Sequence, residues 1–332
     1  MHSLTAKRKE KINPLDVSIV IVSWNTCEIL RNCLRSVYEQ THGVSFEVIV
    51  IDNSSSDDSA AMVKEKFPKV ILIENTENRG FAAANNQGMK IATGRYVLLL
   101  NSDTIVLDNA IVRTVTFDDG YPEAAVVGCR VLNPDRTLQK TCFMFPSLLN
   151  MFLSSTYLYK LFTKSKFFGR EQMTWWDRND IREVDVATGC FMLVRKEAIQ
   201  KVGMMDEQFF MYGEETDWCY RFKQAGWKVM FTPVGNIIHY GGVSSSKMAA
   251  KMTLQLRGAI LQFIAKRYSK GTYILSCILT GTFFSFRIPF WLIKTIVSPR
   301  NRLNCWSTVK VYSTGVFRLL RGYKGLLVKA DR

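Results

Sequence analysis

An aspartate directly follows a strongly apolar run in the first third of the chain. Asp103 lies in Asn101-Ser102-Asp103-Thr104, after the run Arg-Tyr-Val-Leu-Leu-Leu at 95–100. A run with no polar face predicts a strand buried on both sides of a parallel sheet, and such sheets bind ligands beyond the carboxyl ends of their strands. A carboxylate there suits a divalent cation that bridges a phosphorylated ligand. The alternative is that Asp103 is the N-cap of a helix beginning near Leu107.

Three carboxylates, Glu214, Glu215 and Asp217, stand within four consecutive residues. Apolar residues at helical spacing up to Gly226 predict that they open a helix. Because the largely apolar run 208–213 precedes them, we expect partial burial, which raises the pKa of a carboxyl group as a general base requires. The alternative is that the three charges only complement the helix dipole.

One of the three histidines, His239, lies in an organised motif, Ile-Ile-His-Tyr-Gly-Gly at 237–242. The residues before it predict a strand, and the two glycines allow close approach of the backbone. Imidazole is a common metal ligand. A histidine among apolar residues is also often purely structural, so the residues alone leave both interpretations open.

The hydrophobic pattern predicts the elements that position these residues. Apolar, β-branched runs predict strands over 17–24, 46–51 and 96–100, while 25–28, Asn-Thr-Cys-Glu, has the spacing of an N-cap and a Glu that opens a helix. The small residues of 82–86 predict a further helix. Strands and helices alternate, which is the pattern of a doubly wound, mostly parallel α/β sheet.

Seven blocks in a fixed order carry a family resemblance. They are VSIVIVSWN, VIVIDNSSSDDS, NRGFAAANNQG, YVLLLNSD, ATGCFMLVRKEAI, MDEQFFMYGEETDWCYR and IIHYGGVSS. Together they resemble the inverting glycosyltransferases of family two, and more closely the bacterial rhamnosyltransferase-like branch that builds lipid-linked surface polysaccharides. The match covers roughly residues 15–268. It implies a Rossmann-like nucleotide-diphospho-sugar transferase fold of the GT-A type.

The resemblance implies a metal site and a base. Asp103 and His239 would hold Mg²⁺ or Mn²⁺, which neutralises charge on the departing diphosphate. The family usually has Asp-x-Asp where this chain has Asn101-Ser102-Asp103, which makes Asp103 the firmer ligand. Glu215 occupies the base position of the family's Glu-Asp-x-Asp pattern, and Glu214 and Asp217 would orient it or the acceptor.

The resemblance also implies a nucleotide pocket and an acceptor side. The nucleotide-binding residues would be Asn25, Asp52, Asn53, Arg79 and Asn101, with Asp52 reading the pyrimidine ring. For Asp52-Asn53 a solvated turn that caps the next helix is the competing interpretation, and the two are compatible. Gly189 and Trp218 would lie on the acceptor side.

Positive charge concentrates in the last quarter of the chain. The 332 residues carry 44 Lys and Arg against 29 Asp and Glu, but from Lys247 onward sixteen basic residues face a single acid, Asp331. Segment 272–297 is long enough to cross a bilayer but is interrupted by Arg287 and Pro289. We therefore expect an in-plane or re-entrant anchor, attracted to an anionic membrane surface by its basic residues.

These patterns divide the chain into three parts: a flexible basic N-terminus (1–14), a catalytic domain (15–268) and a membrane-associating C-terminal region (269–332). Residues 1–14 lack the apolar stretch of a signal peptide, and the eight cysteines form no C-x-x-C pair, which predicts reduced thiols. The expected location is the cytoplasmic face of a bacterial inner membrane, with peripheral attachment. Because the basic tail contains no recognised nucleic-acid motif, nucleic acid is not an expected partner.

The predicted function is metal-dependent, inverting transfer of one sugar, with rhamnose from dTDP-rhamnose favoured, onto a lipid-diphosphate-linked saccharide in surface polysaccharide synthesis. Transfer is expected to be non-processive because the Gln-x-x-Arg-Trp motif of processive synthases is missing. The alternatives are transfer of another hexose from a UDP- or GDP-sugar, and a noncatalytic nucleotide-binding membrane scaffold. A nucleotidyltransferase would need a Gly-rich phosphate loop after the first strand, and residues 23–26, Ser-Trp-Asn-Thr, do not form one.

Overall fold

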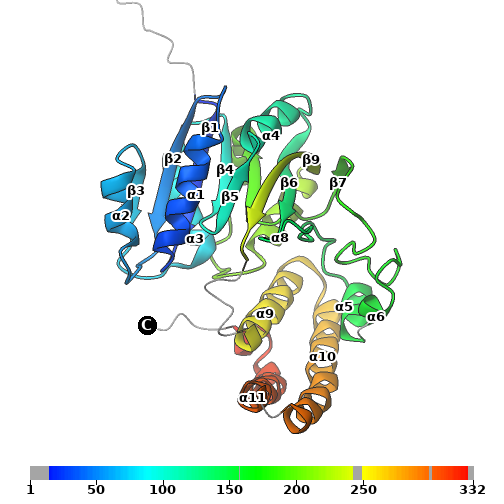
Figure 1. Cartoon of the computed structure of the whole chain (residues 1–332). Helices are drawn as coiled ribbons and strands as arrows, with labels where there is room; N and C mark the ends of the chain where they lie inside the picture. Colours follow the sequence, from blue (N-terminus) through cyan, green and yellow to red (C-terminus); the bar gives the residue numbers. More distant parts are fainter. Residues whose placement is uncertain (1–14, 157, 242–248, 299–300, 328–332) are drawn as a thin grey trace, which may run out of the picture.

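The computed structural model shows an α/β domain followed by a helical region (Figure 1). It describes residues 15–156, 158–241, 249–298 and 301–327; the basic segment predicted at 1–14 lies outside them. The strands are β1 (Val17–Ser23), β2 (Phe46–Asp52), β3 (Ile71–Glu74), β4 (Tyr96–Asn101), β5 (Thr104–Leu107), β6 (Ala124–Leu132), β7 (Arg182–Glu183), β8 (Phe191–Arg195) and β9 (Lys228–His239). The helices are α1 (Cys27–Glu39), α2 (Ser59–Lys66), α3 (Gly80–Ile91), α4 (Ala110–Asp119), α5 (Leu148–Ser155), α6 (Leu158–Leu161), α7 (Lys196–Val202), α8 (Glu214–Gln224), α9 (Ala249–Arg267), α10 (Lys270–Val297), α11 (Arg302–Arg318), the short 3-10 helix η3 (Leu319–Arg321) and α12 (Tyr323–Leu326).

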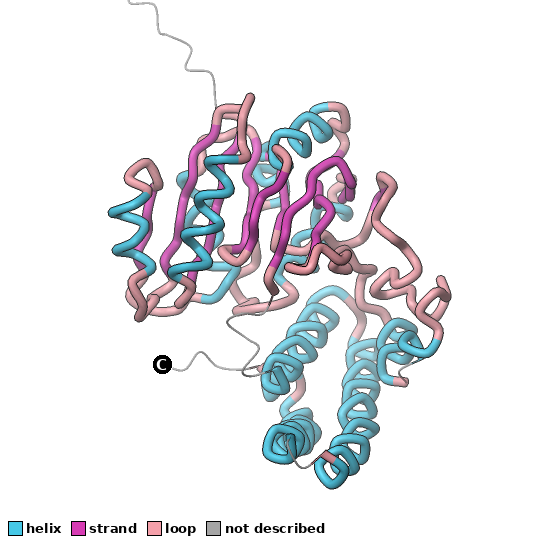
Figure 2. Tube along the Cα trace, viewed as in Figure 1, coloured by secondary structure: helices cyan, strands magenta, loops and turns pink. Residues whose placement is uncertain are grey.

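The nine strands form one sheet in the order β3-β2-β1-β4-β8-β6-β9-β5, with β7 beside β9 (Figure 2). The first four strands are mutually parallel, whereas β8 runs antiparallel to β4, and β5 antiparallel to β9. The predicted α/β fold with a mostly parallel sheet is confirmed. The carboxyl ends of β1, β2 and β4 consequently meet at one edge, where open α/β sheets bind their ligands.

Helices cover both faces of the sheet because its central strands, such as β1, β4 and β8, are apolar and buried on both sides. One apolar cluster joins the sheet to α1, α2 and α4 through residues such as Leu34 and Ile111. A second joins the other face to α3, α7 and α8 through residues such as Met89 and Phe222. This packing positions the loops at the carboxyl edge.

The structure excludes one alternative interpretation and contradicts one local prediction. The residues after Asp103 form β5 up to Leu107 rather than the start of a helix, because they pair with β9. Asp103 therefore lies in a turn between two strands and is not an N-cap. Asn25 does not cap α1 either, since the N-cap is Thr26 and the Asn25 carboxamide oxygen instead accepts the backbone N–H of Ser56 at 2.7 Å.

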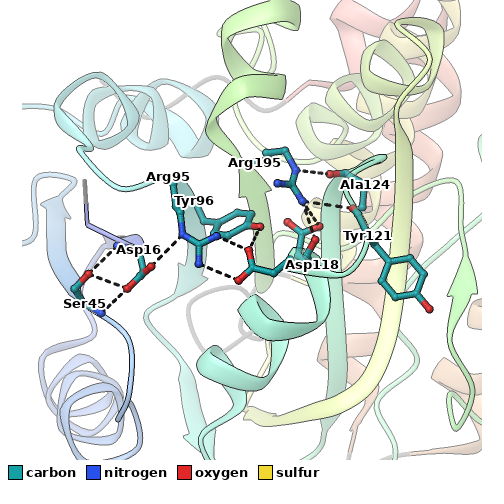
Figure 3. A network of polar contacts seen from close by, with 9 residues as sticks. Asp16, Ser45, Arg95, Tyr96, Asp118, Tyr121, Ala124 and Arg195 are labelled. Carbon is teal, nitrogen blue, oxygen red and sulfur yellow. Dashed lines mark hydrogen bonds and ion pairs between the residues drawn. The ribbon is translucent and has the colours of Figure 1, made fainter. Parts of the chain in front are cut away.

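An ion-pair network closes the opposite, amino-terminal edge of the sheet (Figure 3). Arg95 donates to both Asp16 and Asp119, and Arg195 lies 3.0 Å from the buried Asp118. Burial raises the pKa of Asp118 to about 7, with the Arg195 charge opposing that rise. The network ties β1, β4, β8 and α4 together at the edge away from the carboxyl ends, so its role is structural.

The helical region lies beside the carboxyl edge of the sheet (Figure 1). A third apolar cluster contains Phe209 from the α/β domain, Leu254 from α9, Phe284 from α10 and Tyr312 from α11, so packing continues across the predicted boundary after residue 268. Helix α10 runs for 28 residues through Pro289 without a break. The sequence interruptions therefore do not end the helix.

Among the described residues, α10 is the one helix long and apolar enough to cross a membrane. Arg287 nevertheless points inward: it is 3% exposed, donates to the carbonyl oxygens of Ser154 and Ser155, and stacks on Phe283. The other side of the helix is apolar and open to solvent. Its exposed large apolar residues, which we name the α10 apolar face, are Ile274, Leu275, Ile278, Phe286, Phe290, Leu292, Ile293, Ile296 and Val297.

Candidate active site

The pairing of β5 with β9 brings together two residues far apart in the sequence. Thr104 lies opposite His239 in the register, which places the preceding Asp103 at the end of β9. His239 Nε2 lies 3.2 Å from Asp103 Oδ1, and the two side chains are 15% and 14% exposed. The backbone N–H of Tyr240 also donates to the Asp103 carbonyl oxygen at 2.9 Å. The two predicted metal ligands therefore meet at the carboxyl edge of the sheet.

Gln139 forms hydrogen bonds with His239 through the ring nitrogen that does not face Asp103 and through the backbone. It lies outside every strand, and no sequence motif indicates it. Its Oε1 lies 2.6 Å from His239 Nδ1, and its Nε2 donates to Asn133 Oδ1 and to the His239 carbonyl oxygen. Because a carboxamide oxygen can only accept, Nδ1 carries a proton, and Nε2 is the ring nitrogen that faces Asp103. With its proton on Nδ1, a neutral imidazole can ligate a metal through Nε2.

The donor set of this pair fits a divalent cation shared with a phosphorylated ligand. Asp103 supplies carboxylate oxygen and His239 supplies imidazole nitrogen, and within the described ranges no cluster of three His, Cys, Asp or Glu residues surrounds a common point. Hard cations such as Mg²⁺ are commonly held by one or two protein ligands together with substrate phosphates and water. The pair therefore suits a cation that binds together with a diphosphate.

Asn101 and Cys190 connect this pair to the other half of the site. Asn101 Nδ2 lies 3.3 Å from His239 Nε2, and its backbone N–H donates to the Cys190 carbonyl oxygen, next to the β4–β8 pairing. Burial raises the pKa of the Cys190 thiol to about 12, and the charges of Asp103 and Glu215 add to that rise. The thiol is thus an inert group near both carboxylates.

Helix α8 begins at a turn that directs two carboxylates inward. Tyr212 and Gly213 have φ angles of +67° and +87°, in the left-handed region. After this turn Glu215 Oε1 accepts the backbone N–H of Gly189 at 3.2 Å. Glu214 is 2% exposed, and its Oε2 has no hydrogen-bond partner among the described residues. The turn therefore places a buried acid, Glu214, beside a half-buried one, Glu215, at the edge of the sheet.

The electrostatics of these acids distinguish between them. Burial raises the pKa of both, and the rise is larger for Glu214 because the Glu215 charge adds to it. The Gly189 amide stabilises the charged form of Glu215. A proton held by the pair therefore resides on Glu214, while Glu215 stays ionised and able to accept a proton. This order is the one that the predicted assignment of Glu215 as the base requires.

Asp217 has a different role. It has no exposed surface, and its two oxygens pair with Arg221 Nε at 2.9 Å and with Arg267 Nη2 at 2.6 Å. The second pair links α8 to α9. Asp217 therefore positions the helix that carries Glu215 and does not reach an acceptor.

Asp52 ends β2 at the same edge, with 5% of its surface exposed. Its Oδ2 accepts the backbone N–H of Ser55, while its Oδ1 is buried without a hydrogen-bond partner among the described residues. An unpaired buried oxygen costs free energy, and a ring N–H of a nucleotide base would supply the missing donor. The turn is therefore compatible with the predicted binding role of Asp52.

The other predicted nucleotide residues mainly shape the loops around Asp52. The buried carboxamide of Asn53 bonds to Asn78 and to the Arg79 N–H, and Asn25 bonds to the loop that follows Asp52. The Arg79 side chain itself is exposed. Asn25 and Asn53 thus act through the backbone they hold, and Arg79 remains the candidate for direct phosphate contact.

Gly189 and Trp218, the two predicted acceptor-side residues, lie in different surroundings. A Cβ at position 189 would lie 2.7 Å from Glu215 Oε1 and 3.1 Å from the Phe81 ring, so only glycine fits beside Glu215. Contrary to the prediction, Trp218 has no exposed surface and its indole N–H donates to the Gly203 carbonyl oxygen. Trp218 lies on the side of α8 that packs into the core against the sheet.

Comparison with known proteins finds relatives that are named for glycan biosynthesis or for sugar transfer. Agl10, a low-salt glycan biosynthesis hexosyltransferase from Haloferax volcanii, is 24% identical over 73% of this chain and 72% of its own length. An N-acetylglucosaminyl-diphospho-decaprenol L-rhamnosyltransferase from Mycobacterium tuberculosis is 24% identical over 76% of this chain and 84% of its own. The O-antigen biosynthesis protein RfbC from Myxococcus xanthus is 25% identical over 69% of this chain, which spans 17% of that protein.

Solved structures share the fold. The mannosyltransferase PcManGT from Pyrobaculum calidifontis, in complex with GDP-Man and Mn²⁺, has a TM-score of 0.58 at 14% identity over 96% of this chain and 92% of its own. GalNAc-T7 with UDP, GalNAc and Mn²⁺ has a TM-score of 0.53 at 17% identity over 77% of this chain and 48% of its own. Residues 18–203 match the model of Glycosyl transferase family 2. Since this match covers more than half of the chain, the chain belongs to glycosyl transferase family 2 and is a glycosyltransferase with the GT-A fold.

Proposed function

We propose that this enzyme transfers a single sugar, with inversion, from a nucleotide-diphospho-sugar to a hydroxyl of a lipid-diphosphate-linked saccharide in surface polysaccharide synthesis. The observation that carries the proposal is the convergence of the Asp103–His239 pair, the Glu214–Glu215 pair and the unpaired Asp52 oxygen at one sheet edge. Rhamnose from dTDP-rhamnose is the favoured donor, since one relative is named an L-rhamnosyltransferase acting on a diphospho-decaprenol sugar. Transfer from a UDP- or GDP-sugar is the alternative.

Each residue has a defined task in this proposal. Asp103 and His239 would hold Mg²⁺ or Mn²⁺, which when bound neutralises charge on the departing diphosphate. Asp52 binds the ring N–H of the base. Glu215 accepts the proton of the attacking hydroxyl, and the Gly189 amide keeps its carboxylate in place.

The donor assignment is tested by incubating the purified protein with Mn²⁺ and separate nucleotide sugars, then measuring release of the nucleoside diphosphate. Release from dTDP-rhamnose, raised by added membrane lipid extract, is expected. Faster release from a UDP- or GDP-hexose would change the donor but keep the reaction class. No release from any donor would favour a nucleotide-binding scaffold.

The buried acid pair predicts a specific pH dependence. Glu215 must be ionised to act as a base, and burial raises its pKa. We therefore expect kcat to rise with pH on the acid limb of its profile, with a midpoint above the ordinary pKa range of carboxyl groups. Glu214→Gln should barely move this limb, since Glu214 already carries a proton when Glu215 titrates. A limb that shifts clearly to lower pH in Glu214→Gln would show that both acids are ionised in the active enzyme.

Gln139 should control metal affinity. Gln139→Leu removes the acceptor that sets the His239 tautomer, and loss of such a partner typically weakens metal binding by about 10–100-fold. The readout is free Mn²⁺ measured by electron paramagnetic resonance during titration. Gln87→Leu serves as a matched control, since Gln87 bonds to Asn75 away from the pair. Equal Mn²⁺ affinity in the two variants would mean that His239 does not ligate the metal.

We further propose peripheral attachment to the cytoplasmic face of a bacterial inner membrane through the α10 apolar face and the basic charge of the C-terminal helices. Ile278, Phe286 and Ile293 are 60%, 62% and 62% exposed on one side of α10. An exposed apolar surface of this kind, with basic residues nearby, suits insertion into the lipid interface.

Replacing Ile278, Phe286 and Ile293 together by Gln should abolish sedimentation with anionic vesicles and leave the melting temperature nearly unchanged. The matched control replaces Ile71, Ile91 and Ile181, which are exposed elsewhere, by Gln. Vesicle sedimentation that survives the α10 substitutions would place the anchor in another part of the chain.

A further inference from the structure

A hollow of about 610 Å³ lies between α9, α11, η3 and α12, apart from the site described above. Its walls contain five basic residues, Lys251, Lys310, Arg318, Arg321 and Lys324, and no acidic one. We name it the basic pocket. Its volume lies within the range of sites that bind small molecules or head groups.

The charges around the basic pocket have no carboxylate partners in the described structure: none of the five takes part in the ion pairs found there. The described helices from α9 to α12 contain no Asp or Glu at all. Five like charges around one hollow repel one another, and an anion bound between them offsets that repulsion. The pocket therefore selects for a ligand with more than one negative charge.

Two exposed apolar residues adjoin the arginines of the basic pocket in the chain. Phe317 and Leu320 directly precede Arg318 and Arg321 and are 73% and 88% exposed. An anion that carries a hydrocarbon chain would use both the basic walls and these apolar neighbours. A fully hydrated polyanion would leave the apolar residues unused, so the surface favours the head group of a lipid.

The wall formed by α9 connects the basic pocket to the catalytic turn. Leu254 lines the pocket, and the next residue, Gln255, donates through Nε2 to the Met211 carbonyl oxygen at 2.9 Å. Met211 lies three residues before Glu214. One turn further along α9, Ala259 packs against Gly213. A Cβ added to Gly213 would lie 3.3 Å from the Cβ of Ala259. A head group in the pocket would therefore be separated from the catalytic turn by a single helix.

We propose that the basic pocket binds the diphosphate of the lipid-linked acceptor. This inference rests on the proposed function and assigns a site to its second substrate. The diphosphate would contact Arg318, Arg321 and the three lysines, its hydrocarbon chain would leave over Phe317 and Leu320, and the attached saccharide would extend toward Glu215.

The test measures binding of a long-chain polyprenyl diphosphate without a saccharide, in neutral detergent micelles, to the full-length protein by titration calorimetry. Arg318→Gln with Arg321→Gln should weaken binding by about tenfold or more, the usual effect of losing charged hydrogen bonds. Arg318→Lys with Arg321→Lys should retain most of it. The matched control, Lys270→Gln with Arg302→Gln, removes two exposed charges from the same region outside the pocket and should bind as the original does.

Two further arms identify the source of the phosphate. Phosphatidylglycerol in the same micelles and inorganic pyrophosphate should each bind at least about tenfold more weakly. Equal binding of phosphatidylglycerol would show a general site for anionic lipids, and equal losses in the pocket and control variants would show that charge alone, without the pocket, attracts the ligand. Either result overturns the inference. Because this ligand carries no sugar, its binding is measured independently of transfer, so lack of product with intact binding would count against the proposed function alone.

Discussion

Asp103→Ala is expected to reduce turnover by about a thousandfold or more, with donor binding weakened as well. Asp103 is the carboxylate that meets His239 at the carboxyl edge, and stabilising the charge that develops on phosphate usually contributes a large share of the rate enhancement. The measurement is steady-state transfer at several Mn²⁺ concentrations.

Asp58→Asn is the matched control, because Asp58 is exposed near the same edge and its side chain makes no capping bond to α2. Full activity of Asp103→Ala, or full activity of the original protein in excess EDTA, would remove the cation from the account. Loss of activity in Asp58→Asn as well would point to general damage of the nucleotide side.

Glu215→Gln is expected to lower kcat by about 10²–10⁴-fold, the usual contribution of a general base, and to leave donor affinity nearly unchanged. The substitution keeps the size of the side chain, and its amide oxygen can still accept from Gly189. What it removes is the ability to take a proton. The measurement is kcat for transfer together with the dissociation constant of the donor.

Glu214→Gln provides the comparison within the pair. It mimics the protonated form that burial already favours, so activity should fall much less. An inactive Glu214→Gln together with an active Glu215→Gln would move the base by one position. Activity in both single variants would mean that neither acid is the base.

Much of the fold could be predicted because the strands alternate with helices and are apolar on both faces. The strand that ends in Asn101 and the helix that begins with Glu214 start or end where their patterns indicate. The strand after Asp103 is harder to recognise: the sequence Thr-Ile-Val-Leu at 104–107 favours a strand, but four residues are too short a run to decide without the pairing with β9. The turn that holds Asp103 follows from that long-range pairing.

The candidate site likewise contains residues that motifs indicate and residues that only the fold brings there. Asp103, His239 and Glu215 could be found from motifs, because their types and order carry the family pattern. Gln139 could not, since it lies in an irregular segment and reaches His239 only in the folded chain. The acceptor-side assignment of Trp218 rests on the resemblance alone and is wrong, whereas its spacing with Phe222 correctly indicates the side of α8 that faces the core.

The C-terminal region illustrates how packing changes the meaning of a composition. Arg287 and Pro289 suggested a broken apolar segment, yet α10 is continuous, and Arg287 is satisfied by carbonyl oxygens of α5. The basic residues likewise look like a uniform surface charge in the sequence. Only the fold shows that five of them surround one hollow.

The most direct test of the central claim is the mass of the lipid product. Purified enzyme, Mn²⁺, dTDP-rhamnose and a polyprenyl-diphosphate-linked N-acetylhexosamine are incubated, and the lipid fraction is analysed by mass spectrometry. We predict a product heavier by one deoxyhexose residue, formed with the original protein and missing with Glu215→Gln. An unchanged lipid mass with every nucleotide sugar and every lipid-linked acceptor offered would contradict the account, and addition of many sugars per lipid would contradict single-sugar transfer.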